Sequence, residues 1–299
     1  MYFNGSNRTN MMKRLRYACL FLLTLSACAQ TPAVQEKGEW IQLFNGKDLK
    51  DWDIKIAKHD LNDNFGNTFR VEDGLLKIRY DQYKDFDDQY GHIFYKKKFS
   101  AYLVAVEYRF TGEQVPGGPG WAIRNNGVML HCQSAGSMGK HQDFPISLEM
   151  QLLGGNGTDP RTTANLCTPG TNVVMNGKLI TDHCISSTSK TYNGDAWVRA
   201  EALVLGDSIV KHIVEGDTVL TYTQPQIGGG SVSHFEPALK QDGKLLKEGY
   251  IALQGESAPT DFRKVELFNL EPYMKDPAAL SRVLQELQQR DTSTAGKEE

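Results

Sequence analysis

Apolar and polar residues alternate in short runs through most of the chain, and turn-forming residues separate the runs. The runs cover 40–44, 69–80, 103–110, 127–132, 147–153, 172–181, 197–205, 208–216, 219–223, 249–254 and 264–270. Two of them contain a hairpin signal, Asp73-Gly74 and Asn176-Gly177. About eleven strands without a helical period between them predict an all-β fold, either an antiparallel sandwich or a jelly roll.

The run "PISLEMQLLGG" at 145–155 shows the alternation most clearly. Ser147, Glu149 and Gln151 share one face of the predicted strand, and the apolar residues between them share the other. The apolar face is expected to be core. Because Glu has a low strand propensity, its carboxylate in mid-sheet must be solvated, paired or used in function.

Only the C-terminus changes to a helical period. Pro277 follows Asp276, and the apolar residues recur at Leu280, Val283, Leu284 and Leu287. This spacing predicts one amphipathic helix over 276–290 and a frayed tail over 291–299. We expect the helix to pack on the sandwich, and a partner-binding helix is the alternative.

The N-terminus is typical of a bacterial lipoprotein. A basic segment precedes an apolar run that ends in Leu25-Ser26-Ala27-Cys28, which resembles a lipobox. We therefore expect a signal peptide at 1–27, a lipid on Cys28, a polar tether over 28–38 and a location in the cell envelope, periplasmic or at the outer membrane. An ordinary signal peptide and a short anchor helix are the alternatives.

Charge argues against a nucleic-acid partner. The chain of 299 residues has 33 basic and 36 acidic residues, and residues 1–27 hold four of the basic ones and no acidic one. The remainder carries 29 basic against 36 acidic residues, a net charge of about −7. With 40% hydrophobic residues, the composition is that of an ordinary globular protein.

Three of the five cysteines remain after Cys19 and Cys28 are assigned to the leader and the lipid. In an oxidising compartment, a disulfide between Cys167 and Cys184 would close a turn-rich loop and leave Cys132 as a buried thiol. A metal site that uses His183 or His131 is the competing hypothesis, but no paired Cys or His spacing supports it.

Five segments in order resemble the 3-keto-disaccharide hydrolase family, which is related to concanavalin-like jelly rolls. They are "LFNGKDLKDW", "VEDGLLKI", "RNNGVMLHCQS", "SLEMQLLGG" and "GYIALQGESAPTDFRKVELFNL", which together span roughly 39–271. The resemblance implies a jelly-roll domain over 39–273, followed by the helix and tail at 274–299, and a concave face that binds carbohydrate.

The resemblance also implies activity on 3-keto-glycosides or 3-keto-disaccharides that a sugar 3-dehydrogenase has produced. A ketone at C3 acidifies the proton on C2, so that a base can remove it and the C1–O bond can break by elimination before water adds. Such a site needs one base, an electrophile or divalent metal ion on the ketone oxygen, and donors for the hydroxyl groups. No nucleotide cofactor is implied.

The family's Glu-x-Gln landmark makes Glu149 the first candidate for the base or a metal ligand, and Gln151 a candidate for binding a hydroxyl group. A cross-strand pair between Glu149 and an Arg is the structural alternative. If the alternation continues through 127–132, His131 faces the same way as Glu149 and could act as a ligand or a proton carrier. A histidine with a purely structural role is the alternative.

A loop before 127–132 supplies further candidates. Arg124 could polarise a carbonyl oxygen, Trp121 could stack on a sugar ring, and Asn125 and Asn126 could bind hydroxyl groups. The other candidates for substrate binding are Lys140 and His141 in the loop that leads to Glu149, Glu107 on the run 103–110, and Gln254, with Glu256 as a secondary candidate near the C-terminus.

Two other functions fit the sequence. A jelly roll serves lectins as readily as enzymes, so the protein could be a non-catalytic carbohydrate-binding lipoprotein. A conventional glucanase-type hydrolase is the second alternative. It requires two carboxylates on one strand face, and the run 147–153 offers only Glu149, which counts against it.

Overall fold

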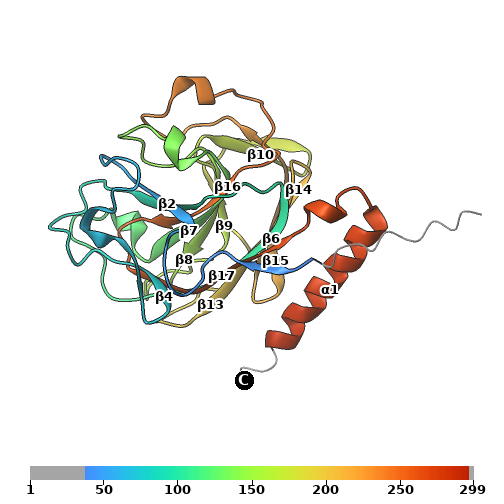
Figure 1. Cartoon of the computed structure of the whole chain (residues 1–299), viewed down its shortest axis with the longest axis horizontal. Helices are drawn as coiled ribbons and strands as arrows, with labels where there is room; N and C mark the ends of the chain where they lie inside the picture. Colours follow the sequence, from blue (N-terminus) through green and yellow to red (C-terminus); the bar gives the residue numbers. More distant parts are fainter. Residues whose placement is uncertain (1–37, 296–299) are drawn as a thin grey trace, which may run out of the picture. The chain divides into compact units, whose positions relative to one another are not determined.

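Two antiparallel sheets make up most of the computed structural model, which describes residues 38–295 (Figure 1). The larger sheet contains β1 (Trp40–Gln42), β3 (Phe69–Glu72), β4 (Leu75–Ile78), β6 (Ala101–Phe110), β10 (Thr171–Met175), β11 (Lys178–Ile180), β13 (Val198–Leu205), β14 (Ile209–Val214), β15 (Asp217–Ile227) and β17 (Thr260–Asn269). The smaller sheet contains β2 (Trp52–Ile56), β5 (Gly91–Tyr95), β7 (Asn125–Cys132), β8 (Leu148–Leu153), β9 (Asn165–Cys167), β12 (Cys184–Ile185) and β16 (Tyr250–Gly255). The predicted all-β jelly-roll sandwich is confirmed, whereas the predicted leader, Cys28 and the tether up to residue 37 lie outside the described residues.

Strand order explains how distant segments come together in the smaller sheet. Its strands follow the order β12-β9-β8-β7-β16-β5-β2. Strand β16, which comes late in the chain, lies between β7 and β5 and pairs with both. The region around 250–256 is therefore placed beside β7, which in turn lies beside β8.

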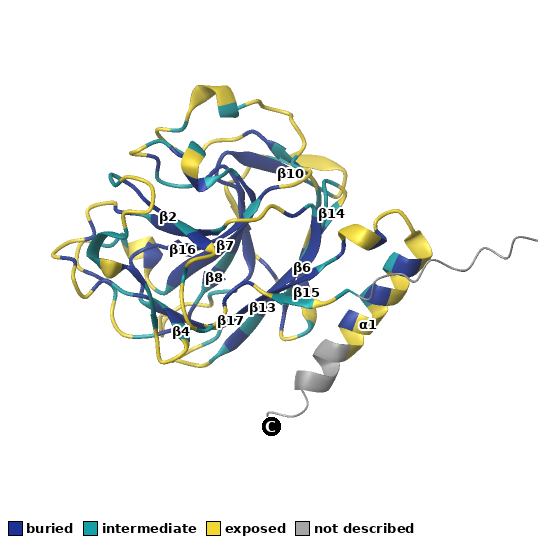
Figure 2. Ribbon diagram, viewed as in Figure 1, coloured by how far each residue is buried: buried dark blue, intermediate teal, exposed yellow. Residues whose placement is uncertain are grey.

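The alternation in β8 is confirmed as a two-sided strand. Leu148, Met150 and Leu152 are fully buried in the apolar layer between the two sheets. Figure 2 shows the same pattern across both sheets, with buried strands and exposed connecting loops. Burial of about 25 cal/mol per Å² of apolar surface in this layer supplies the main stabilisation of the sandwich.

The C-terminal helix α1 (Pro277–Ala295) packs on the larger sheet. The carboxylate of Asp276 accepts hydrogen bonds from the backbone N–H groups of Ala278 and Ala279, and so caps the first turn. Val283 and Leu287 are buried against residues such as Phe268. The packing prediction is correct, but the predicted end at 290 is wrong, because the helix continues to Ala295.

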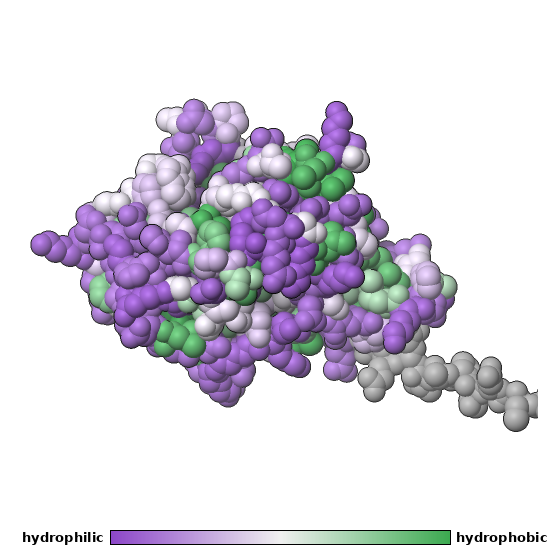
Figure 3. Space-filling model, turned by 90° about the horizontal axis from the view of Figure 1, so that it is seen from above, coloured by the Kyte–Doolittle hydropathy of each residue, from purple (hydrophilic) through white to green (hydrophobic). Residues whose placement is uncertain are grey.

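Within 38–295, no helix has the length and apolar character that crossing a membrane requires. On the face of the molecule that Figure 3 presents, hydrophilic residues dominate and apolar residues form separate small patches.

Cys167 and Cys184 form the predicted disulfide, with an S–S distance of 2.03 Å. The two residues face each other directly in the β9–β12 pair. Cys132 is a buried free thiol, also as predicted. A sulfur in a disulfide is not a thiolate ligand, so the competing metal-site hypothesis is not supported in this state, even though His183 lies next to both sulfurs.

The larger sheet carries an ion-pair network that includes Glu107. This carboxylate pairs with Arg263 and, at 3.1 Å, with Lys264. Burial opposes its ionisation, but the hydrogen bonds from these two cations outweigh burial and lower the pKa of Glu107. Glu107 lies on β6, in the sheet opposite to Glu149, so the prediction that it binds substrate beside Glu149 is wrong.

Candidate active site

A cavity of about 420 Å³ lies on the face of the smaller sheet that points away from the core. Strands β7, β8, β9 and β12 and six of the connections between strands supply its walls. They contribute Trp121, Asn125, Asp143, Phe144, Glu149, Gln151, Leu153, Cys167, Pro169, His183, Cys184, Ser231 and Glu256. Glu149 and Gln151 reach this cavity because they alternate with the core-facing residues of β8.

The carboxyl group of Glu149 lies across Gly127 of the neighbouring strand. A Cβ atom added to Gly127 would come within 2.4 Å of Oε1 of Glu149. Val128 pairs with Leu253 of β16, so Gly127 is next to the position of Gln254. The missing side chain at residue 127 therefore creates the space that lets Glu149 reach from β8 towards β16.

Burial makes the ionised form of Glu149 unfavourable. Its side chain is 5% exposed, and Oε1 has no hydrogen-bond partner among the described residues. Loss of hydration raises the pKa of Glu149 to about 8. The group can therefore both hold and release a proton near neutral pH, as acid–base catalysis requires.

Glu256 supplies a second carboxyl group to the same cavity. It follows the end of β16, is buried, and has one oxygen, Oε2, without a described partner. Burial raises the pKa of Glu256 well above its usual range, and the negative charge of Glu149 raises it further. Within 38–289 neither carboxyl group forms an ion pair that would stabilise its negative charge. Because both groups line the same cavity, ionisation of one makes ionisation of the other less favourable.

Two amides and an indole complete the polar wall and the rim. Asn125 is buried, and its Oδ1 has no described partner. Gln151 accepts a hydrogen bond of 3.1 Å from Nδ2 of Asn165. Trp121 is 57% exposed at the edge of the cavity. Of the predicted site residues, the structure thus brings together Glu149, Gln151, Asn125 and Trp121.

His131 lies in a β-bulge of β7 and faces away from Glu149. Along the β7–β16 pair, Met129 faces Ala252 but Cys132 faces Tyr250, so β7 contains one extra residue. His131 has a φ angle of 49° in this bulge. Its ring turns inward, packs against Tyr102 and has its Nε2 3.1 Å from the carbonyl oxygen of Gly206.

The predicted shared face of His131 and Glu149 is therefore wrong. Burial lowers the pKa of His131 to about 4, which keeps the ring neutral in the core. Its roles as metal ligand or proton carrier beside Glu149 are excluded by this orientation.

Arg124 also points elsewhere. Its guanidinium group bonds the carbonyl oxygen of Gly194 and lies 3.4 Å from the carboxylate of Asp195. It lines a different cavity, together with Glu113 and Asn156. The predicted contact of Arg124 with a substrate carbonyl group beside Glu149 is wrong, because the side chain ties the 194–195 loop to the start of β7.

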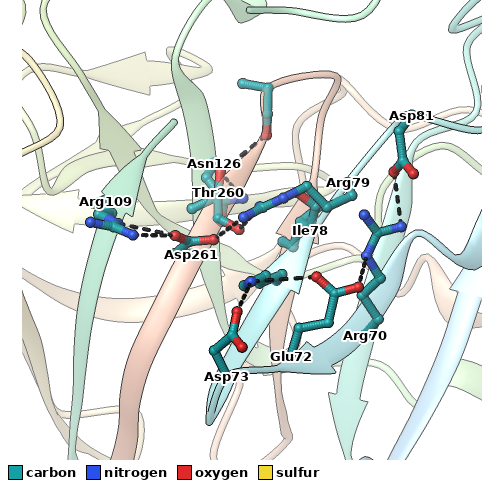
Figure 4. Close-up of polar contacts among 12 residues, drawn as sticks. Arg70, Glu72, Asp73, Ile78, Arg79, Asp81, Arg109, Asn126, Thr260 and Asp261 are labelled. Atoms are coloured by element: carbon teal, nitrogen blue, oxygen red, sulfur yellow. Dashed lines mark hydrogen bonds and ion pairs between the residues drawn. The ribbon is translucent and has the colours of Figure 1, made fainter. Parts of the chain in front are cut away.

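Asn126 is a structural residue (Figure 4). Its amide donates a hydrogen bond to the backbone oxygen of Gln254, at 2.6 Å. It also donates one to the hydroxyl oxygen of Thr260, at 3.3 Å, on the strand that Figure 4 shows beside it. Figure 4 also shows Asp261, the residue after Thr260, held between Arg79 and Arg109. Asn126 thus joins the smaller sheet to β17 in the larger one, and its predicted hydroxyl-binding role is wrong.

The remaining predicted residues lie beside or beneath the cavity. Gln254 is fully buried, and both polar atoms of its amide lack described partners. Lys140 is exposed and pairs with Asp60 at 2.9 Å. His141 lines a neighbouring cavity that shares Asp143 with the first. None of Gln254, Lys140 and His141 lines the cavity of Glu149.

Glu256, a secondary candidate in the sequence, lines the cavity, and so do His183 and Phe144, which the sequence does not place there. The signal for Glu256 was present, because Gln254 and Glu256 repeat at the period of two found in β8. His183 enters the cavity wall through the disulfide of its neighbour Cys184. Burial lowers its pKa, so a neutral imidazole faces the cavity.

Two carboxyl groups in one cavity on a sheet of a β-sandwich are of the kind that glycoside-cleaving enzymes use, and the family match of the chain supports a carbohydrate-active enzyme of the glycoside hydrolase type. A match over most of the sequence identifies the family. Residues 39–267 match the 3-keto-alpha-glucoside-1,2-lyase-like domain, and the chain belongs to that family.

Solved structures with similar folds are distant in sequence. A candidate glycosyl hydrolase from Parabacteroides distasonis has 16% identity and a TM-score of 0.47, and the match covers 78% of this chain and 100% of the other. LamA from Z. galactanivorans, in complex with laminaritriose and laminaritetraose, has 10% identity and a TM-score of 0.45, with 77% and 98% covered. The β-glucanase of Bacillus licheniformis has 11% identity and a TM-score of 0.42, with 78% and 97% covered. No curated protein matches the chain.

Proposed function

We propose that the protein cleaves 3-keto-glycosides by elimination across C1–C2 followed by addition of water. The observation that carries this proposal is that Glu149 and Glu256, two buried carboxyl groups without ion-pair partners in the described part of the chain, line one cavity. Family membership supports the same substrate class. The 3-ketone has to be supplied by an enzyme that oxidises the sugar at C3.

Glu149 is the base in this mechanism. Its ionised carboxylate takes the proton from C2, and the C–H electron pair forms the enolate of the 3-ketone. The enolate then collapses, the C1–C2 double bond forms, and the C1–O bond to the leaving group breaks. Burial favours the neutral form of the Glu149 carboxyl group. Taking the proton from C2 therefore removes the unfavourable negative charge of Glu149.

Glu256 is the acid. Burial and the negative charge of Glu149 both raise the pKa of Glu256 well above its usual range, so we assign it the proton when the pair carries one negative charge. It donates this proton to the leaving oxygen. In the second half, Glu256 accepts a proton from water as the oxygen adds to C1. The proton on Glu149 exchanges with solvent once the leaving group has departed, and Glu149 then protonates C2, so that both groups regain their starting states.

Neutral donors around the pair are suited to the ketone and hydroxyl oxygens. The amides of Asn125 and Gln151 and the neutral imidazole of His183 line the same cavity. Stabilising negative charge on the ketone oxygen is the largest demand of an elimination through an enolate. We assign these three residues to substrate binding.

The oxygen atoms of the site also fit a divalent cation. Oε1 of Glu149, Oε2 of Glu256 and Oδ1 of Asn125 are buried without described partners, and carboxylate and amide oxygens are the ligands that hard cations prefer. These three residues would hold such an ion in place of the proton that the two carboxyl groups otherwise share, and the ion would supply a Lewis acid for the ketone oxygen.

Conventional hydrolysis of an unoxidised glycoside is the second candidate. The absence of a second carboxylate on β8 counts against it, but Glu256, directly after β16, supplies a second carboxyl group to the cavity. The two functions differ in their dependence on the ketone, because hydrolysis by two carboxylates needs no acidic C2 proton.

The test compares a 3-keto-glucoside with its unoxidised parent and follows release of the leaving group. We expect turnover of the ketone alone, and loss of that turnover in Glu149→Gln. Turnover of the parent but not of the ketone would replace the elimination by ordinary hydrolysis. Binding of both compounds without turnover would favour the non-catalytic lectin.

A further inference from the structure

A second cavity, of about 440 Å³, adjoins the one that holds Glu149 and Glu256. Its lining includes Lys58, Asp88, Tyr90, His141, Ser233 and His234. Asp143 lines both cavities. The two spaces are therefore neighbours on one side of the smaller sheet, and they are similar in size.

The wall between them is fixed by hydrogen bonds. The carboxylate of Asp143 accepts one from the backbone N–H of Ser233, at 2.8 Å, and one from its hydroxyl group, at 2.7 Å. Ser231, two residues earlier, lines the first cavity. This short segment thus contributes to both cavities, and Asp143 holds it in place between them.

Aromatic rings run along the same boundary. The ring of Tyr90, in the second cavity, is nearly parallel to that of Trp121, in the first, with an interplanar angle of 10° and centroids 6.4 Å apart. Phe144, which also lines the first cavity, lies 4.9 Å from Tyr90. Ring faces of this kind pack against the apolar faces of sugars.

The second cavity is lined by hydrogen-bonding groups, and Ala57 is its only aliphatic side chain. The side chains of Asp88, His141 and His234 form no hydrogen bond or ion pair with any residue in 38–289. The rings of His141 and His234 have centroids 6.3 Å apart. These groups are available to a ligand, and their chemistry suits one with many hydroxyl groups rather than an apolar one.

We propose that the cavity of Tyr90, His141 and His234 binds the leaving group of the substrate, and that it selects a sugar over an aromatic leaving group. The proposal rests on the proposed cleavage reaction, because it defines which part of the substrate lies beyond the broken bond. The reacting ring occupies the cavity of Glu149 and Glu256. The bond between the two sugar units then passes beside Asp143, which borders both cavities.

The experiment measures kcat/KM on two kinds of 3-keto-glucoside in the purified protein. One kind has glucose as its leaving group, prepared from maltose and cellobiose. The other has 4-nitrophenol, in both anomers. We expect His141→Ala combined with His234→Ala to lower the ratio of sugar to nitrophenyl kcat/KM about tenfold, because about 1.4 kcal/mol in hydrogen bonds is lost.

Lys97→Ala is the matched control, since Lys97 is exposed on the β5–β6 connection and lines neither cavity. The control should leave the ratio unchanged. An unchanged ratio in the double histidine variant, or an equal loss on both kinds of substrate, would overturn the subsite.

A binding measurement separates this proposal from the cleavage reaction. If no 3-keto-glucoside is cleaved, the proposed reaction fails, and calorimetry with unoxidised maltose, cellobiose and the methyl glucosides still tests the subsite. We expect the disaccharide of the matching anomer to bind about tenfold more tightly than its methyl glucoside, and the double variant to lose this advantage. Equal affinities in the unaltered protein would overturn the subsite.

Discussion

The carboxyl group of Glu149 occupies the space directly over Gly127, where a side chain on the neighbouring strand would otherwise lie. This relationship turns a residue of β8 towards β16, and so towards Glu256. A glycine inside a strand costs about 0.5–1 kcal/mol relative to alanine. Here the cost is offset by the position it gives to a buried carboxyl group.

Gly127→Ala tests this relationship. The new Cβ would lie 2.4 Å from Oε1 of Glu149, so the carboxyl group must move. We expect kcat to fall by about a hundredfold, as for a misplaced acid–base group, with about 1–3 kcal/mol less stability from overpacking.

Gly120→Ala is the control, because a Cβ there meets no atom within 4 Å. It should leave kcat and stability nearly unchanged. Full activity of Gly127→Ala would show that the position of the Glu149 carboxyl group is not critical.

Replacing one carboxyl group should change the acidity of the other. The charge of Glu149 contributes to the raised pKa of Glu256, so we expect Glu149→Gln to lower the pKa of Glu256. Carbon-13 NMR of labelled glutamate side chains measures this. An unmoved Glu256 resonance across the titration would mean that the two groups do not interact.

The dependence of stability on pH follows from the same burial. The pKa of Glu149 is about 8 in the folded protein and 4.5 for the ordinary group, so between these values the folded state binds more protons than the unfolded one. Stability that is present below pH 4.5 is therefore lost as the pH rises towards 8, by an amount on the order of a few kcal/mol. Urea denaturation at pH 5 and pH 8 should show a smaller loss for Glu149→Gln than for the unaltered protein, and an equal loss would contradict the burial of this charge.

The disulfide is expected to support both stability and the cavity wall. Its loop spans a sequence separation of 17 residues, for which about 3 kcal/mol is typical. Cys167→Ser with Cys184→Ser should lower the free energy of unfolding by about this amount and raise KM, because His183 loses its anchor. Dithiothreitol added to this variant is the control and should change neither its stability nor its KM. An unchanged KM in the variant would show that the part of the cavity wall around His183 does not contribute to substrate binding.

Trp121→Ala should weaken substrate binding without affecting the chemical step. The indole is 57% exposed at the rim, so its removal should cost little stability. We expect KM to rise about tenfold and kcat to stay within about twofold, since a ring at the rim contributes binding rather than acid–base chemistry. A fall in kcat with KM constant would place Trp121 in the chemical step instead.

The sequence predicted the two-sided strand β8, the capped C-terminal helix and the disulfide, because each depends on local periodicity or on a small set of cysteines. It did not predict the short strands β9 and β12, which contain three and two residues and are held by their neighbours. His131 was misplaced because one extra residue in β7 reverses every later side chain, and no local signal marks that bulge.

The position of Glu256 could not be predicted from the sequence for a different reason. Its position beside Glu149 depends on β16 entering the sheet next to β7, a pairing between segments more than 100 residues apart. Alternation shows which residues share a face of one strand, but only the strand order shows which strands share a cavity. The second carboxyl group, and with it the acid of the proposed reaction, therefore became apparent only in the folded arrangement.

Deuterium incorporation tests the central claim most directly. The protein cleaves a 3-keto-glucoside in D₂O, the released 3-keto-glucose is trapped by reduction at early times, and a parallel incubation of 3-keto-glucose without protein corrects for spontaneous exchange. Elimination followed by addition of water predicts one deuterium at C2 of the product, delivered through Glu149. A product released with its original hydrogen at C2 would contradict the proposed mechanism, because the C1–O bond would then have broken without removal of that proton.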